Sequence, residues 1–170
     1  MNKKKAGVVF IVLLTGVLAG QALAQSPEFK SNADDLAKIR SVVEEYRQDI
    51  IRKDGYAITK LVLNHSVLFH HINTQEEIDS ARKRNAQFDG IGPSHLDELV
   101  DIFATSKDKL EGKLQNIEIR QDGPLGMVTF NYDFYINDKL TNSGLEHWQL
   151  CKIDGQWKIL SVTWTSYSHS

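Results

Sequence analysis

Cysteine is almost absent from this sequence, because Cys151 is the only one among 170 residues. A single cysteine excludes an intramolecular disulfide even in an oxidising compartment. Cys151 lies within an apolar strand pattern, which favours a small buried hydrophobe over a reactive thiol. A domain of this length buries roughly two-thirds of its unfolded surface, so it needs no such cross-link.

Motifs for metal binding and for hydrolysis are also missing. The six histidines form no His-x-His or His-x-x-x-His pair, and no carboxylate stands at a ligand spacing from them. His70 and His71 are adjacent, so a regular strand points them to opposite faces. The sequence has no Gly-x-Ser-x-Gly motif and none for a nucleotide, haem or flavin. We therefore expect no metal site and no cofactor.

Only one long apolar run occurs, and it stands at the N-terminus. Three lysines at 3–5 precede an apolar run over 6–20, and Ala22-Leu23-Ala24 supplies the small residues of a peptidase site. This pattern is typical of a secretory signal peptide over 1–24. The run is shorter than the ~20 apolar residues of a bilayer span, so a retained anchor is the weaker alternative. We expect a periplasmic or secreted protein with no membrane association after cleavage.

Acidic side chains outnumber basic ones once this peptide is removed. Seventeen basic and 22 acidic side chains are left. An acidic balance argues against nucleic acid as a partner. Residues 25–32 have the composition of a flexible lead-in, and 33–170 have the length of a single domain.

Helical patterns dominate the first part of this domain. Apolar residues spaced three and four apart, from Leu36 to Ile50, predict an amphipathic helix. Ser31 or Asn32 can cap its start, and Asp54-Gly55 ends it. We expect a short second helix over 56–63.

A capping box then predicts a third helix. Thr74 and Glu77 can satisfy each other's free backbone donors at a helix start. This helix is expected to turn Ile78, Ala81 and Phe88 inward. A strand over 67–72 is expected before this helix and a loop over 89–93 after it. The next stretch, 95–105, is ambiguous between helix and strand, and we expect a strand over 99–105.

The rest of the chain has a β pattern. Strands are expected over 114–120, 126–136, 145–153 and 157–166. The turns between them, which include Asp154-Gly155, are short enough to force antiparallel neighbours. Helices first and a meander afterwards predict an α+β domain with its helices on one face of the sheet.

The closing strands carry a family likeness. The segments GLEHWQL at 144–150, KIDGQWKI at 152–159 and VTW at 162–164 are similar to the terminal hairpin of the nuclear transport factor 2-like, or SnoaL-like, superfamily. Lys53-Asp54-Gly55 and Phe69-His70 fit this likeness as well. The resemblance implies a cystatin-like cone, in which a curved antiparallel sheet wraps around three N-terminal helices. It further implies a pocket inside the cone and homodimers through the sheet.

The same resemblance offers candidate catalytic residues. Aligned with the steroid isomerase branch, Tyr46 takes the place of the oxyanion-donating tyrosine, His70 that of the aspartate base, and Gln149 lies near the second acid. Only the tyrosine matches in type. In the scytalone dehydratase branch, histidines and tyrosines do the acid-base work. The hypothesis is that Tyr46, His70 and either His147 or Gln149 point into one pocket; a core role for Tyr46 is the simpler alternative.

Strand alternation supplies candidate binding residues without choosing a face. Tyr132 shares one face of its strand with an apolar stripe, whereas Asp133 lies on the other. Asp133 reads as a solvated or cross-strand carboxylate, with a pocket acid as the minority reading. Trp164 belongs to the closing motif. We take Gln149, Tyr132, Trp164 and Asp133 as candidate ligand-binding residues.

These observations favour an exported protein that binds an unknown small molecule, apolar or amphipathic, in the cone pocket. A cofactor-independent lyase or isomerase is the alternative, since the acid-base set is incomplete. A third interpretation is a non-catalytic dimeric interaction module.

Overall fold

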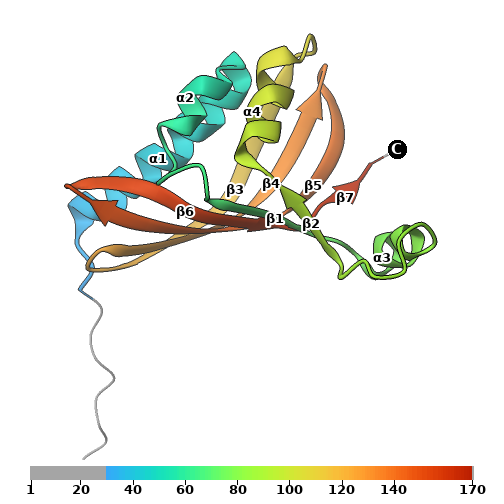
Figure 1. Cartoon of the computed structure of the whole chain (residues 1–170). Coiled ribbons are helices and arrows are strands. Elements are labelled where there is room, and N and C mark those ends of the chain that lie inside the picture. The colour runs from blue at the N-terminus through green and yellow to red at the C-terminus, as the bar shows by residue number, and fades with distance from the viewer. Residues whose placement is uncertain (1–29, 170) are drawn as a thin grey trace, which may run out of the picture.

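The computed structural model describes residues 30–169, so the predicted signal peptide lies outside the described residues. Helices α1, α2 and α4 lie over one face of a curved seven-stranded sheet, while α3 stands apart beyond β1 and β2 (Figure 1). No helix in this part of the chain is both long and apolar enough to cross a membrane. In chain order the elements are α1 Ala33–Arg52, α2 Gly55–Thr59, β1 Leu68–Ile72, α3 Gln75–Arg82, β2 Ile91–Ser94, α4 Leu96–Thr105, β3 Leu110–Asp122, β4 Leu125–Ile136, β5 Lys139–Ile153, β6 Gln156–Trp164 and β7 Tyr167–Ser168.

The sheet has the order β2-β1-β6-β5-β4-β3, with β7 added beside β5. All pairs are antiparallel except β1 and β6, which run parallel. The turn at Asp154-Gly155 has positive φ at both residues, 49° and 77°, which matches the twist of a two-residue hairpin. The predicted α+β cone is confirmed.

Helix α1 is capped at Asn32, as the sequence allows, but it ends before the expected Asp54-Gly55. Asp54 instead caps α2, where its side chain accepts from the Ala57 backbone N–H at 2.9 Å. The Asn32 side chain accepts from the Asp35 backbone N–H at 2.8 Å, and Lys53 ends the helix in the left-handed conformation. Residues 25–29 of the expected lead-in lie outside the described residues, whereas residues 30–32 are hydrogen-bonded to β3 and the β3–β4 turn. The Lys30 backbone N–H donates to Asp122 at 3.0 Å.

Three local predictions are wrong. The expected strand over 99–105 is helix α4, where apolar residues recur at helical spacing and Glu98 accepts from the His95 N–H at 3.4 Å. The expected loop over 89–93 contains most of β2, an edge strand paired with β1. Helix α3 forms with its capping box but buries none of its residues, so the third helix over the sheet is α4 instead.

The apolar face of α1 packs on the concave side of the sheet. Ile39 and Val43 of α1 are buried, and so are Trp148 and Leu150 of β5. Burial of large side chains such as these is the main stabilising term of the fold. The remaining core members come from α1, α2, α4, the segment between α2 and β1, and strands β1, β3, β4 and β6. They include Ile58, Val62, Phe69, Leu96, Phe103, Val128, Phe130, Trp157, Ile159 and Val162.

A buried ion pair fixes the start of α1 against the last hairpin. Asp35 is buried, and its carboxylate accepts from Lys152 at 2.7 Å and from the Trp157 indole at 2.9 Å. These hydrogen bonds, with Lys152 first and Trp157 second, hold the pKa of Asp35 at about 2. A lowered pKa means that the ionised carboxylate stabilises the fold above its unfolded value of 3.8.

Replacing Asp35 with asparagine is expected to lower the thermal midpoint at pH 7 and to flatten its acid dependence. The stabilisation by wild-type Asp35 is lost as pH falls from 3.8 towards 2, whereas Asp35→Asn has no such loss. Thermal unfolding followed by circular dichroism over this range measures both effects. Asp34→Asn is the matched control, because Asp34 is exposed and pairs only with Lys38 on the helix surface. Equal acid profiles for the two variants would contradict the assignment.

Candidate functional site

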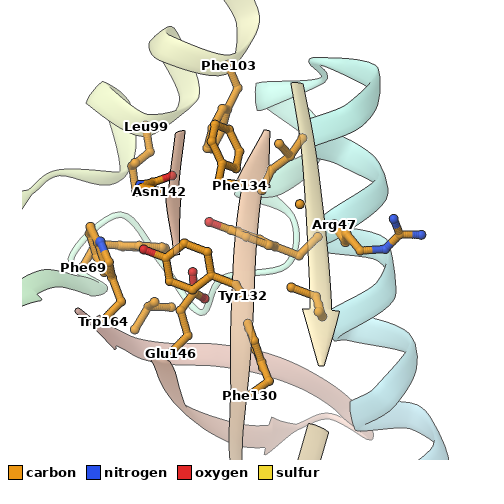
Figure 2. Close-up of a pocket in the computed structure, with 15 residues that line it drawn as sticks. Arg47, Phe69, Leu99, Phe103, Phe130, Tyr132, Phe134, Asn142, Glu146 and Trp164 are labelled. Carbon is orange, nitrogen blue, oxygen red and sulfur yellow. The ribbon is translucent and has the colours of Figure 1, made fainter. Parts of the chain in front are cut away.

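The inside of the cone contains a cavity of about 200 Å³. It lies between the concave face of β3 to β6, helix α1 and helix α4 (Figure 2). Most of its lining is aromatic or aliphatic, and the polar groups are few. The lining residues are Tyr46, Arg47, Ile50, Phe69, Leu99, Phe103, Gly112, Leu114, Phe130, Tyr132, Phe134, Asn142, Glu146, Val162 and Trp164.

Strand register explains why these side chains meet. Phe130 pairs with Glu146, and Glu146 pairs with Trp164, so all three point to the same face of the sheet. Phe69 and Val162 are also paired and continue this face onto β1. The cavity is therefore a product of pairing between strands from both ends of the domain.

Glu146 is the single carboxylate in the cavity lining. It is half-buried, and Figure 2 shows its carboxylate among the lining side chains, between Tyr132 and Trp164. One oxygen, Oε2, accepts from the Trp148 indole at 2.7 Å. Burial raises the pKa of Glu146 to about 7, although the Trp148 hydrogen bond opposes this rise. Glu146 therefore changes its protonation state near neutral pH.

Tyr46 reaches the same cavity from α1. Its ring stands edge-on to Trp148 with the centroids 5.0 Å apart. Burial, and then the negative charge of Glu146, raise the pKa of Tyr46 well above its usual value. The hydroxyl is thus a neutral donor throughout the physiological range, and it has no hydrogen-bond partner among residues 30–169.

Tyr132 is fixed more firmly than Tyr46. Its hydroxyl donates to the Thr165 carbonyl at 2.9 Å, and burial raises its pKa. Its neighbour in register, Gly144, permits this approach, because a Cβ there would lie 1.9 Å from the Thr165 oxygen. Tyr132 is therefore a wall of the cavity whose polar end is already satisfied.

Arg47 lies at the edge of the cavity and carries the only positive charge in its lining. Its guanidinium is held by Glu44 through two hydrogen bonds of 2.9 and 2.6 Å. In Figure 2 the guanidinium points away from the other lining side chains. Arg47 thus contributes its apolar stem to the cavity more than its charge.

The structure brings three of the predicted site residues together. Tyr46, Tyr132 and Trp164 all line the cavity, on α1, β4 and β6. The cavity also holds Leu99 and Phe103, which lie in the helix α4 that the sequence analysis misassigned. In the described part of the chain, no three His, Cys, Asp or Glu side chains are grouped as metal ligands would be.

The hypothesis that Tyr46, His70 and either His147 or Gln149 share one pocket is wrong. Thr163 of β6 pairs with both His70 of β1 and His147 of β5. Each histidine directly follows a residue that lines the cavity, Phe69 on β1 and Glu146 on β5. Because alternate residues face opposite sides of a sheet, they lie on the outer face.

Two of the three other candidates on the outer face have local side-chain partners. The His147 Nδ1 lies 3.1 Å from the Thr129 hydroxyl, and Gln149 is exposed. Asp133 accepts from the Gln115 side chain at 2.9 Å, as expected for a cross-strand carboxylate. None of these residues lines the cavity.

Glu146 is the residue that the sequence analysis missed. The signal was present in strand alternation, because Glu146, Trp148 and Leu150 share a face and the latter two are large hydrophobes. A carboxylate is costly to bury without a partner, so its place on an apolar face is itself a sign of function.

Solved structures with the same fold are numerous, although neither a protein-family model nor a curated protein matches the sequence. An NTF2-like protein from Cytophaga hutchinsonii is 15% identical, with TM-score 0.58 over 81% of this chain and 100% of that one. An NTF2-like protein with a cystatin-like fold from Novosphingobium aromaticivorans is 9% identical, with TM-score 0.59 over 81% and 84%.

A third neighbour carries a proposed activity. It is a proposed dehydratase of the NTF2-like family from Streptomyces avermitilis, 10% identical, with TM-score 0.57 over 79% of this chain and 96% of that one. Identities this low establish the fold and not the activity. The chain therefore has the nuclear transport factor 2-like, cystatin-like fold that its closing hairpin indicates.

Proposed function

We propose that the protein binds a small, largely apolar molecule inside the cone, with Glu146 and the Tyr46 hydroxyl holding its polar group. The observation that carries this proposal is the aromatic cavity with one carboxylate inside it. Ligand sites are typically apolar hollows in which a few polar groups fix orientation. The second oxygen of Glu146 and the Tyr46 hydroxyl have no protein partner among the described residues, so both are available to a ligand.

The three tryptophans allow a direct test. Trp164 lines the cavity and the Trp148 indole donates to Glu146, whereas the Trp157 indole is bonded to Asp35 at the far end of α1. In ¹H–¹⁵N spectra, a panel of one-ring aromatic fragments is expected to shift the Trp164 and Trp148 indole signals and to leave Trp157 in place. A panel that moves none of the three, or all of them equally, would count against the proposal.

A cofactor-independent lyase or isomerase is the second candidate. The observation in its favour is a carboxylic acid with a pKa of about 7 beside an unpartnered tyrosine hydroxyl, which suits proton transfer next to a carbonyl. In this role Glu146 moves the proton and Tyr46 donates to the developing oxyanion. Deuterium uptake by small cyclic ketones in D₂O, lost in Glu146→Gln, tests it. Uptake equal in both proteins would remove this candidate.

We further propose that the protein is exported and pairs through the outer face of its sheet. The signal pattern of the first 24 residues supports export. Exposed Leu68 and Leu145 on the outer face support pairing, since 55% and 45% of their surfaces are open. Intact mass and light scattering of the secreted protein test the two statements.

A further inference from the structure

We infer that the polar group recognised in this cavity is a protonated amine, so that the ligand is a small aryl-alkyl ammonium compound. This inference rests on the proposed binding function and specifies its ligand class. It stands on three features of the cavity: the charge balance of its lining, the aromatic side chains around the carboxylate, and the size of the space.

The charge balance leaves Glu146 without a cation. No lysine, arginine or histidine within the described chain forms an ion pair with it. Arg47 is already neutralised by Glu44, and its guanidinium points away from the cavity. A half-buried carboxylate on an apolar wall is stabilised either by keeping its proton or by gaining a positive partner. In this cavity only the ligand can supply that partner.

Aromatic side chains favour the same kind of ligand. Aromatic side chains line the cavity on the two strands that neighbour β5, namely Phe130 and Tyr132 on β4 and Trp164 on β6. Phe69 continues this wall on β1, the strand next to β6. Aromatic faces attract cations through their quadrupoles, most strongly when water is excluded. A neutral alcohol lacks the charge needed for this cation–π attraction. An anionic ligand is repelled by the ionised carboxylate of Glu146. The combination of one carboxylate and several rings therefore selects an organic cation.

The size of the cavity limits the ligand. A space of about 200 Å³ suits a group about the size of one substituted ring. Leu99 and Phe103 of α4 close one side of the space, and both are apolar. The ring of the ligand is expected to lie against these residues, with its amine at Glu146.

The pH dependence follows from which groups face Glu146. Tyr46 of α1 and Tyr132 of β4 line the cavity with Glu146. Arg47 of α1 lies at the edge with its guanidinium held by Glu44, and His71 of β1 stacks on Trp164 with the ring centroids 5.8 Å apart. The helix α4 and strand β3 present no titratable side chain to the cavity. An ammonium ligand needs ionised Glu146, whose pKa is about 7, so affinity should rise about tenfold between pH 6 and 8. A ligand carbonyl would prefer the protonated acid and show the opposite trend.

Three isosteric probes test the inference by calorimetry: 2-phenylethylamine, 2-phenylethanol and phenylacetate. At pH 8 the amine is expected to bind roughly tenfold more tightly than the alcohol, and phenylacetate not at all. Glu146→Gln is expected to bring the amine down to the affinity of the alcohol. Asp133→Asn is the matched control, since it removes a carboxylate from the outer face and should leave amine binding unchanged.

The outcomes distinguish failure of the ammonium inference from failure of the proposed ligand-binding function. Alcohol binding equal to or tighter than amine binding in the wild type overturns the ammonium inference and leaves a ligand cavity in place. An amine affinity that falls in Asp133→Asn as much as in Glu146→Gln also overturns it, because the attraction would then be general. If none of the probes binds or shifts the Trp164 indole, the proposed function itself fails.

Discussion

Replacing Glu146 with glutamine is expected to stabilise the fold by about 3 kcal/mol at pH 8 and to change it little at pH 5. The folded-state pKa is raised from 4.5 to about 7, so the folded protein holds this proton more tightly than the unfolded chain does. The contribution of protonated Glu146 to the free energy of unfolding is therefore fully present below pH 4.5. It is lost as pH rises through about 7. Glutamine keeps an oxygen for the Trp148 indole and has no proton to lose.

Urea unfolding at the two pH values measures this difference. Glu118→Gln is the control, because Glu118 is an exposed carboxylate on β3 whose loss should shift neither midpoint. A stability gain in Glu146→Gln that is equal at pH 5 and pH 8 would show that Glu146 is not the group that titrates. The same residue would then lose its place as the polar anchor of the cavity.

Substituting leucine for Gly112 is expected to abolish ligand binding without loss of stability. Gly112 lines the cavity, and a Cβ built there meets no heavy atom within 4 Å, so the cavity has room for a side chain. Glycine inside a strand costs roughly 0.5–1 kcal/mol relative to alanine, so removing it favours the fold. Leucine fills the space that the ligand would occupy.

Gly112→Ala is the matched control for this experiment. Alanine removes the same conformational freedom of glycine from the unfolded chain but fills little of the cavity. This variant should therefore raise the unfolding midpoint and keep ligand binding. Calorimetry with the probe that binds wild type, together with urea unfolding, separates the two variants. Full binding by a stable Gly112→Leu protein would place the ligand outside the cone.

The elements that could be predicted from the sequence are those with local causes. The capping side chains of Asn32 and Thr74 and the turn at Asp154-Gly155 act within a few residues, and the structure has all three. The stretch that forms α4 was expected to be a strand because Lys107-Asp108-Lys109 resembles a hairpin turn, whereas in the structure these residues join a helix to β3. The position of helix α4 over the cavity depends on its packing against α2, a contact between segments about 40 residues apart that local sequence patterns do not reveal.

The site was harder to predict than the fold because its residues lie on strands distant in sequence. Only the pairing register of those strands brings them together. Alternation correctly separates Glu146 from His147, but it does not say which face meets α1. That choice depends on Trp148, which is fully buried against Tyr46 and Phe130. The alignment with enzymes favoured histidines that the sheet turns outward, and a half-buried acid without a cationic partner was not expected.

The order of the strands also determines when the domain can be completed during synthesis. Strand β6 is among the last segments to be made, yet it lies in the middle of the sheet, between β1 and β5. Until it appears, the β1–β2 pair and the β3–β4–β5 meander are two separate halves with no hydrogen bonds between them. A nascent chain therefore keeps the core of this domain open until β6 has been made, because the two halves of the sheet cannot join earlier.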